Sequence, residues 1–175
     1  LTFAWTISGV TNDLLGANVF VEQAMESSAE SLANFLPAVI FVVACGLGFA
    51  TGTSWGTFGI LIPIVVSVFG TDAGTILTVG LGACLGGAVM GDHCSPISDT
   101  TILASTGAQC YHINHVNTQI PYALTVAAVA FVNHILAGLI QNVIINFVIA
   151  LASMFAVLMI IRAVTSKKNA ATAGK

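Results

Sequence analysis

The sequence predicts an all-α, polytopic transmembrane helical bundle that contains a re-entrant hairpin and a discontinuous helix. Three observations lead to this fold class. Of the 175 residues, 57% are hydrophobic and only 6% are charged, with a mean hydropathy of +0.98. A soluble domain carries about 25% charged residues, so this chain could not solvate a globular surface. Long apolar runs recur along the chain, and short polar segments interrupt some of them at membrane depth.

The few charged residues are unevenly placed. All four basic residues follow residue 161, immediately beyond the last apolar run. The positive-inside rule therefore places the C-terminus in the cytoplasm. We expect the chain to cross the cell membrane several times. No basic patch that would bind nucleic acid is present, and the lipid bilayer is the expected surrounding. Between residues 31 and 161 the only formal charges are Asp72, Asp92 and Asp99.

The N-terminal part is expected to contain one incomplete span followed by an aqueous segment. Residues 1–20 are mostly apolar, but the polar residues 11–13 interrupt them. Residues 22–31 carry three glutamates and are expected to lie in water. The chain starts with a leucine inside an apolar stretch and shows no basic segment with a cleavage site. We therefore expect no signal peptide, and we expect the chain to be the C-terminal piece of a longer protein.

A re-entrant hairpin is expected over residues 32–69. Residues 32–50 are long and apolar enough to span the bilayer, with a kink expected at Pro37. The next apolar run, residues 60–70, has only eleven residues and is too short to cross. The segment between them, residues 51–59, is rich in glycine and hydroxyl groups. A long helix, a small polar tip and a short return are more typical of a re-entrant hairpin than of two spans.

The second half of the chain is expected to hold a broken helix and two complete spans. Residues 75–91 are apolar and rich in glycine, and a short helical segment is expected at about 99–110. Residues 111–119 are polar and are expected at the membrane interface. The transmembrane domain is thus expected to cover residues 1–161. The two closing spans are expected at residues 120–140 and 143–161. A disordered cytoplasmic tail is expected at residues 162–175.

Several glycines recur at intervals of four residues. Small residues at this spacing let two helix backbones approach closely in lipid. Because these glycines adjoin the polar interruptions, we expect them to link helix packing to the functional site. They are Gly48, Gly52 and Gly56, then Gly82 with Gly86, and Gly87 with Gly91.

The stretch GDHCSPISDT, residues 91–100, places two carboxylates in the most apolar part of the chain. Pro96 lacks a backbone donor and disfavours a helical conformation of the residue before it. We therefore expect the helix to stop near Gly91 and to restart at Ser98 or Asp99. Unwound backbone at membrane depth is tolerated only where protein buries it or where it lines a cavity. Transporters bind ions and substrates at such breaks.

The expected ion site combines two aspartates with hydroxyl groups. Asp92 and Asp99 have no basic residue nearby in the sequence, so a bound cation or a proton must neutralise them. A carboxyl group buried away from water holds its proton more tightly than one in solution, so H⁺ and Na⁺ can compete for it. His93 is expected to be proton-linked. The candidate ligands are Asp92, Asp99, Ser95, Ser98, Thr100 and Thr101, joined by Thr53 and Ser54 if the hairpin tip meets the break.

Two other interpretations of these residues come from different functional classes. A membrane-embedded metalloenzyme would use His93, Cys94, Cys110, His112 and His115. Their spacing does not match the usual zinc patterns, so we expect no transition metal, no resident cofactor and no catalytic residue. His112 and His115 are instead expected to lie in interfacial water. A non-transporting membrane subunit is the third interpretation, in which Asp92→Asn and Asp99→Asn change assembly but no ion flux.

Two motifs closely resemble those of the NhaC family of Na⁺/H⁺ antiporters. The first is GDHCSPISDTTILASTGAQCYHINHVNTQIPYAL, residues 91–124, and the second is ATGTSWGTFGILIPI, residues 50–64. The resemblance extends from about Trp5 to the last helix, although members of the family are considerably longer. It implies one half of an inverted-repeat transporter, with a re-entrant hairpin and a broken helix in each half. It also implies an ion site lined by Asp92, Ser95, Asp99, Thr100, Thr53 and Ser54.

The resemblance implies a secondary transporter that exchanges cytoplasmic Na⁺ for external H⁺. From their side-chain chemistry, we expect Asp92 and Asp99 to bind the cation and the proton alternately. Because the resemblance extends to exchangers of malate and lactate, an antiporter of these acids coupled to Na⁺ and H⁺ is the alternative. The missing N-terminal half of the same transporter is an expected partner, and a homo-oligomer stays open. Ion sites of inverted-repeat transporters lie between repeats, so we expect this chain to hold half a site and not to transport alone.

Overall fold

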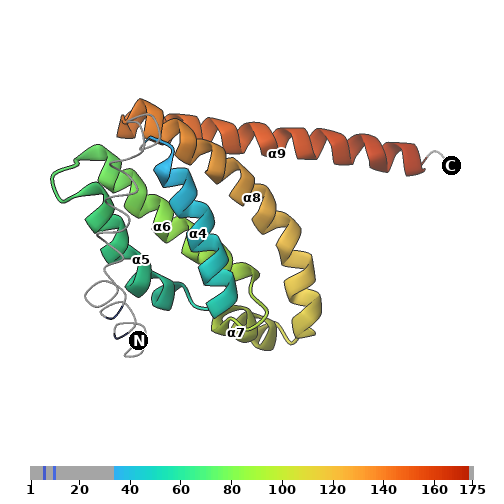
Figure 1. Ribbon diagram of the computed structural model, residues 1–175. Coiled ribbons are helices and arrows are strands. Elements are labelled where there is room, and N and C mark those ends of the chain that lie inside the picture. The colour runs from blue at the N-terminus through green and yellow to red at the C-terminus, as the bar shows by residue number, and fades with distance from the viewer. Residues whose placement is uncertain (1–5, 7–9, 11–33, 174–175) are drawn as a thin grey trace.

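The computed structural model describes Thr6, Val10 and residues 34–173, with side chains to Ser166 (Figure 1). The expected incomplete span at 1–20 and the acidic segment at 22–31 therefore fall outside the described residues, apart from those two single positions. From residue 34 onward the chain forms helices and no strands, which confirms the all-α class for that part. The helices are α4 (Leu36–Thr51), α5 (Ser54–Phe69), α6 (Thr75–Cys94), α7 (Asp99–Gly107), α8 (His112–Ile140) and α9 (Val143–Ala173).

Three of these helices are long and apolar enough to cross a membrane. They are α6, α8 and the Val143–Ser166 part of α9. By contrast, α4 and α5 have 16 residues each. At 1.5 Å per residue such a helix is about 24 Å long, which is shorter than the roughly 30 Å hydrocarbon core.

The predicted bounds of the hairpin are wrong in two respects. The helix expected over 32–50 starts only at Leu36, and Pro37 lies in its first turn, where a proline replaces a donor that has no helical partner and therefore causes no kink. The return helix starts at Ser54, six residues earlier than the apolar run. Thr53 caps this helix by accepting a hydrogen bond from the Gly56 N–H, which lets polar residues join it. The two arms are therefore equal in length, and only Gly52 and Thr53 separate them.

Glycines bring α4 and α6 into close contact, side by side and running in the same direction (Figure 1). A side chain at Gly48 would lie 2.5 Å from the Ala88 carbonyl oxygen. Side chains at Gly87 and Gly91 would meet the carbonyl oxygens of Phe41 and Cys45. The expected glycine packing is thus confirmed for these three positions. It is wrong for Gly82, which faces open space, and Gly86, which makes only an ordinary contact.

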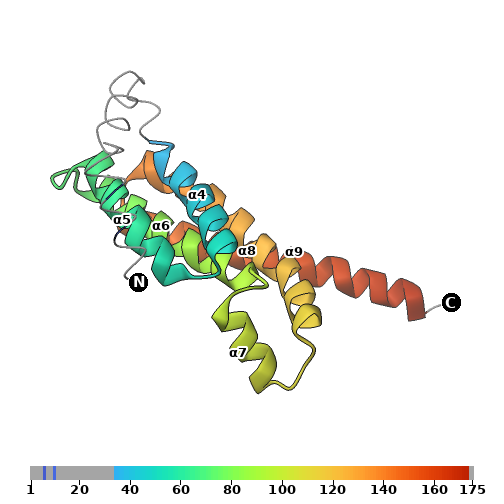
Figure 2. The same ribbon diagram turned by 60° about the horizontal axis from the view of Figure 1, so that its bottom comes forward.

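The core lies where α5 packs on α6 beside this glycine contact. It consists of Ala44 from α4, Leu61 and Val65 from α5, and Cys84 and Ala88 from α6. Because α5 runs back along α6, the α4–α5 connection and the end of α6 come to the same end of the bundle, at the bottom of Figure 1. Figure 2 shows α7 set off from this end, between the end of α6 and the start of α8.

The helix break is shorter than predicted. The sequence suggested an unwound segment from Asp92 to Ser98, but α6 continues to Cys94 and only residues 95–98 are non-helical. The reason is local. A proline restricts the backbone conformation of the residue directly before it, and the residues further upstream can stay helical. Ser95 is extended, with φ −75° and ψ 129°, and the helix reaches the residue just before it. The predicted restart at Asp99 is confirmed.

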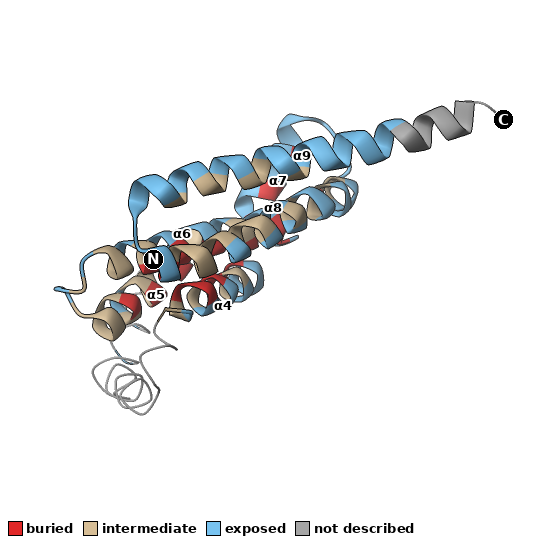
Figure 3. Ribbon diagram, turned by 90° about the horizontal axis from the view of Figure 1, so that it is seen from above, coloured by how far each residue is buried: buried red, intermediate tan, exposed pale blue. Residues whose placement is uncertain are grey.

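The last two helices also extend beyond their predicted bounds. α8 starts at His112, so the polar residues 111–119 are mostly helical and continuous with the span. α9 runs to Ala173, past residue 161, where a disordered tail was expected. No proline or glycine interrupts residues 162–173, and alanine and lysine favour helix. Figure 3 shows α9 exposed along most of its described length, and its apolar surface suits a lipid environment.

Candidate functional site

The break between α6 and α7 is a compact turn with its own hydrogen bonds. The Ser95 N–H donates to the Asp92 carbonyl at 3.1 Å, and the Ser98 N–H donates to the Ser95 carbonyl at 3.3 Å. Ser98 then caps α7, because its Oγ accepts a hydrogen bond from the Thr100 N–H at 3.1 Å. A proline break followed directly by a capping serine explains why the chain leaves one helix and enters another within four residues.

A buried carboxylate lies at the centre of this turn. The Asp92 side chain is only 3% exposed. The Ser98 hydroxyl donates to Asp92 Oδ1 at 2.5 Å, and Thr100 Oγ1 lies 2.6 Å from Ser98 Oγ. Because the single hydroxyl hydrogen of Ser98 goes to Asp92, Thr100 must donate to Ser98. The result is a chain of hydroxyl donors that runs from Thr100 through Ser98 to Asp92.

This carboxylate has no basic partner in the described part of the chain. Arg162 is the only arginine or lysine whose side chain the structure describes, and it lies on the exposed outer end of α9. The second carboxylate oxygen, Asp92 Oδ2, accepts no hydrogen bond from any described residue. Burying a charged carboxylate without compensation is costly. A bound cation or a proton at Asp92 would offset this cost.

Ser95 and Thr101 hold the shape of the break. Both are buried, and the Thr101 hydroxyl donates to the carbonyls of Ser95 at 2.8 Å and Ser98 at 3.0 Å. The Ser95 hydroxyl accepts from the Ile97 N–H at 3.4 Å. The carbonyls of Ser95 and Ser98 are thus already hydrogen-bonded within the break.

The two aspartates lie in different environments. Asp99 is exposed in the first turn of α7, and no hydrogen bond or ion pair joins its carboxylate to another described residue. His93 is also exposed, and its Nδ1 lies 3.1 Å from the Val89 carbonyl rather than against Asp92. The structure therefore brings Asp92, Ser98 and Thr100 together and leaves Asp99 and His93 outside this group.

The hairpin tip meets the break through a glycine rather than through hydroxyl groups. Gly52 has a left-handed φ of 65°, and a Cβ there would lie 2.8 Å from Cγ1 of Ile97 and 3.1 Å from its carbonyl. The Thr53 carbonyl accepts from the buried Thr57 hydroxyl at 2.9 Å, within the tip itself. No hydrogen bond connects Thr53 or Ser54 to either aspartate among the described residues. Only glycine allows this approach of tip and break.

His112 joins three elements at the break, and sequence reasoning missed this. Its Nε2 lies 2.7 Å from the Pro96 carbonyl and its Nδ1 lies 3.0 Å from Ser105 Oγ. His112 is partly exposed, and the sequence did not predict its two hydrogen bonds within the protein. Its place inside the motif of residues 91–124 was the only signal, because no local pattern relates it to Pro96. Since a carbonyl only accepts, Nε2 carries the hydrogen of the first bond.

We expect His112→Ala to lower the stability of the protein by about 1–3 kcal/mol, because two hydrogen bonds that tie α8 and α7 to the break are lost. Thermal unfolding of the purified full-length protein in detergent measures this. Asn114→Ala is the matched control, since Asn114 is an exposed polar residue in the same turn of α8. Equal melting temperatures for the two variants would mean that the hydrogen bonds of His112 do not stabilise the protein.

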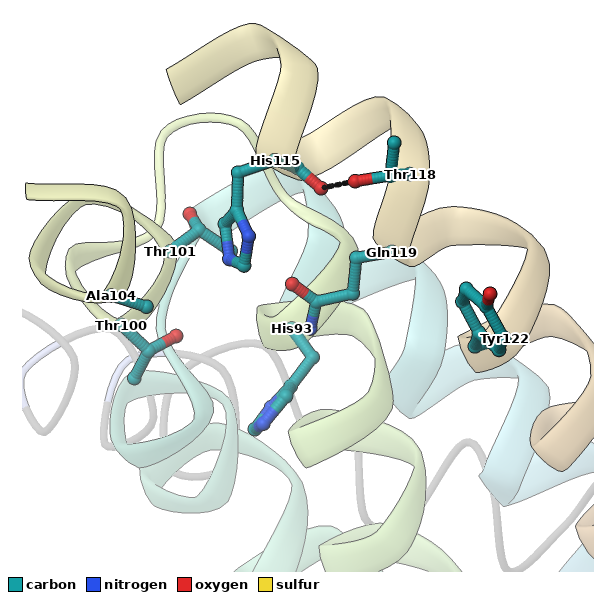
Figure 4. Close-up of a pocket in the computed structure, with 8 residues that line it drawn as sticks. All are labelled: His93, Thr100, Thr101, Ala104, His115, Thr118, Gln119 and Tyr122. Atoms are coloured by element: carbon teal, nitrogen blue, oxygen red, sulfur yellow. Dashed lines mark hydrogen bonds between the residues drawn. The ribbon is translucent and has the colours of Figure 1, made fainter. Parts of the chain in front are cut away.

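A cavity of about 550 Å³ opens beside the break, between α7, α8 and the end of α6 (Figure 4). His93, Thr100, Thr101, Ala104, His115, Thr118, Gln119 and Tyr122 line it. A second cavity of about 340 Å³ shares three of these residues and is otherwise lined by Gly86, Val89, Met90, Ala123 and Val126. Within the described residues, no three histidine, cysteine or acidic side chains gather as metal ligands would.

Comparisons with known proteins agree with this picture of a membrane protein. Residues 1–139 match the model of the Na⁺/H⁺ antiporter family. An uncharacterized protein of Haemophilus influenzae is 41% identical over 162 residues, which are 93% of this chain and 31% of that protein. The malate-2H⁺/Na⁺-lactate antiporter of Bacillus subtilis is 38% identical over 86 residues, or 49% of this chain and 18% of that protein.

A third relative is the arginine/ornithine antiporter ArcD of Halobacterium salinarum. It is 36% identical over 107 residues, which are 59% of this chain and 22% of that protein. The chain thus spans less than a third of the length of each of these three relatives. No solved structure matches the chain.

Proposed function

The chain belongs to the Na⁺/H⁺ antiporter family of secondary transporters, and from this premise we propose that it carries an ion-coupling site that exchanges Na⁺ for H⁺. The observation that carries the proposal is Asp92, a buried carboxylate whose only hydrogen-bond partner among the described residues is the Ser98 hydroxyl. Because the chain belongs to a family of transporters, it is not an enzyme, and the metalloenzyme interpretation is excluded.

The exchange follows from the two ways of neutralising one buried group. With Na⁺ bound, the Asp92 carboxylate is charged and its free Oδ2 is a cation ligand, while the hydroxyl chain from Thr100 through Ser98 stabilises Oδ1. With a proton bound, the group is neutral and has no charge to hold the cation. Because one carboxyl group cannot hold both, cation and proton occupy the site in alternation. This is the requirement for coupled antiport.

The structure supports different roles for the two aspartates. Asp92 is the exchanging group because burial makes its neutralisation obligatory. Asp99 is exposed at the start of α7, where its charge attracts cations toward the break without being forced to bind them. Ser95, Thr101 and the glycine contact at Gly52 keep the break in shape. Thr53 and Ser54 act through the tip rather than as ligands.

We further propose that α4 and α5 form a re-entrant hairpin, as each helix has 16 residues and their connection meets the break. In inverted-repeat transporters the ion site lies between repeats near the bilayer midplane. The remaining ligands would then come from residues beyond this chain, which spans less than a third of its relatives. A cytoplasmic C-terminus follows from the cations after residue 161.

The test is Na⁺-driven proton movement in everted membrane vesicles that contain the full-length protein. Respiration acidifies the vesicle interior, and a pH-sensitive dye reports the loss of acidity when NaCl is added. We expect NaCl to discharge the pH gradient, and KCl at the same concentration to have little effect. Vesicles without the protein are the control. A pH gradient that NaCl leaves intact would contradict Na⁺/H⁺ exchange.

Exchange of an organic solute coupled to Na⁺ and H⁺ is the second candidate function. The cavity of about 550 Å³ next to the break favours it, because a lone ion needs far less space. The named solutes of two relatives, malate with lactate and arginine with ornithine, are organic molecules. Adding each of these four solutes in turn to the same vesicles distinguishes the candidates: a change in the Na⁺-driven signal indicates coupled solute exchange.

A further inference from the structure

We propose that the cavity between α6, α7 and α8 binds a small organic ammonium ion with an apolar tail, and that it disfavours carboxylates. This inference rests on the second candidate function above, in that the solute is organic. It names a class other than the carboxylate-bearing solutes in the names of two relatives. It depends on which hydrogen-bonding groups the cavity wall offers and on the charge of that wall.

The hydroxyl hydrogens of the three lining threonines are all donated elsewhere. Thr100 donates to Ser98 Oγ, as the hydroxyl chain toward Asp92 requires. Thr101 donates to backbone carbonyls in the break. Thr118 donates to the Asn114 carbonyl at 2.8 Å and the His115 carbonyl at 3.0 Å. These residues have acceptor lone pairs to offer a solute but no free donor.

Two further lining groups are acceptors. His93 Nδ1 lies 3.1 Å from the Val89 carbonyl and so carries the hydrogen, which leaves Nε2 of the neutral ring as an acceptor. Gln119 Oε1 is buried and has no hydrogen-bond partner among the described residues. Figure 4 shows the Gln119 amide between His93 and His115, with its oxygen on the side of Thr100 and Thr101. An orphaned buried carbonyl is costly, and an N–H donor from a solute would satisfy it.

The wall also offers no fixed positive charge to a carboxylate. None of the eight lining residues is lysine or arginine, the side chains that bind carboxylates most strongly. The free donors that remain are the Gln119 amide nitrogen, the Tyr122 hydroxyl and the His115 ring. Tyr122 is 76% exposed and lies at the rim.

The adjoining cavity explains the apolar tail. It has about 340 Å³ and shares His93, Gln119 and Tyr122 with the first cavity. Its other lining residues are glycine, alanine, valine and methionine, which offer a hydrocarbon chain apolar contact. An ammonium group in the first cavity and an alkyl chain in the second fit the two cavities together.

The experiment is isothermal titration calorimetry of the purified full-length protein at pH 8, above the ordinary titration range of histidine. Butylammonium has the N–H donors, the charge and the tail. Tetramethylammonium has the charge without N–H donors, and butyrate has a tail of similar size with the opposite charge. We expect butylammonium to bind and the other two to bind at least tenfold more weakly. Equal or stronger binding of butyrate or tetramethylammonium would overturn the inference, as would no binding of butylammonium.

Variants at Gln119 locate the site. Gln119→Leu removes the orphaned acceptor and is expected to weaken butylammonium binding roughly ten- to hundredfold, as for a lost hydrogen bond to a charged group. Gln119→Glu places a carboxylate there and is expected to tighten binding. Asn117→Leu is the matched control, because Asn117 is exposed on the same helix and lines neither cavity. Unchanged binding in both Gln119 variants would place butylammonium elsewhere and refute the site.

Two further arms separate this inference from the proposed exchange. A titration with NaCl alone tests whether the cavity binds Na⁺ instead of an organic ammonium ion. Na⁺ binding that depends on Gln119 would mean that the cavity serves the ion and not an organic solute. The vesicle assay tests the exchange independently of this cavity. Na⁺-driven proton flux without butylammonium binding would refute only the solute class. Butylammonium binding without Na⁺-driven flux would refute only the Na⁺/H⁺ exchange.

Discussion

Replacing Asp92 by asparagine is expected to abolish Na⁺-driven proton exchange while the protein stays folded. Asparagine has nearly the same shape, and its amide oxygen can still accept the hydrogen bond from Ser98. It carries no charge and does not titrate, so neither the cation nor the proton is held. Loss of one partner of a buried charge pair costs about 3–5 kcal/mol, which corresponds to roughly 100-fold or more in cation affinity.

Asp99→Asn is the matched control for this prediction. Asp99 carries the same group seven residues further along the chain, but it is exposed and has no described partner. We expect its exchange rate to fall only severalfold, with a higher Na⁺ concentration needed for half-maximal rate. Everted vesicles with matched protein amounts measure both variants. Normal exchange in Asp92→Asn would refute Asp92 as the coupling group. Complete loss in Asp99→Asn together with that result would assign the role to Asp99.

Gly91→Ala is expected to lower the melting temperature of the protein strongly. A methyl group there would collide with the Cys45 carbonyl and lie 2.6 Å from the Phe49 N–H, which are backbone atoms of α4 that cannot rotate aside. Overpacking of this kind typically costs about 1–3 kcal/mol, even though alanine favours helix over glycine by about 1 kcal/mol. Because Asp92 is the next residue, a displaced α6 also moves the carboxylate, so exchange should fall as well.

Gly82→Ala provides the matched control for the packing prediction. Gly82 lies in the same helix, and a methyl group there meets no atom of the described residues within 4 Å. It should therefore show only the favourable helix propensity and a melting temperature equal to or above that of the wild type. Thermal unfolding of the purified protein in detergent compares the two variants. A similar effect of both substitutions would mean that close contact between α4 and α6 does not stabilise the fold.

The features of the fold that the sequence predicted correctly depend on short stretches of neighbouring residues. Apolar length predicted the membrane helices α6, α8 and α9, because no soluble surface can be built from such runs. Pro96 predicted the break and the restart at Asp99, because proline acts on its immediate neighbours. Helix ends were less accurate: residues 111–119 are polar yet mostly helical, since hydropathy reports on surroundings and not on backbone hydrogen bonds.

The amino-acid sequence was sufficient to place Asp92 and Asp99 at one break, without a neighbouring basic residue, and to suggest that a cation or proton neutralises them. It could not rank them, because both are aspartates beside the same proline. Their burial depends on contacts between distant segments, including α4 against α6 and Gly52 against Ile97. The role of His112, 16 residues from the carbonyl that it binds, was decided in the same way. Burial and partners come from this packing, which no local pattern encodes.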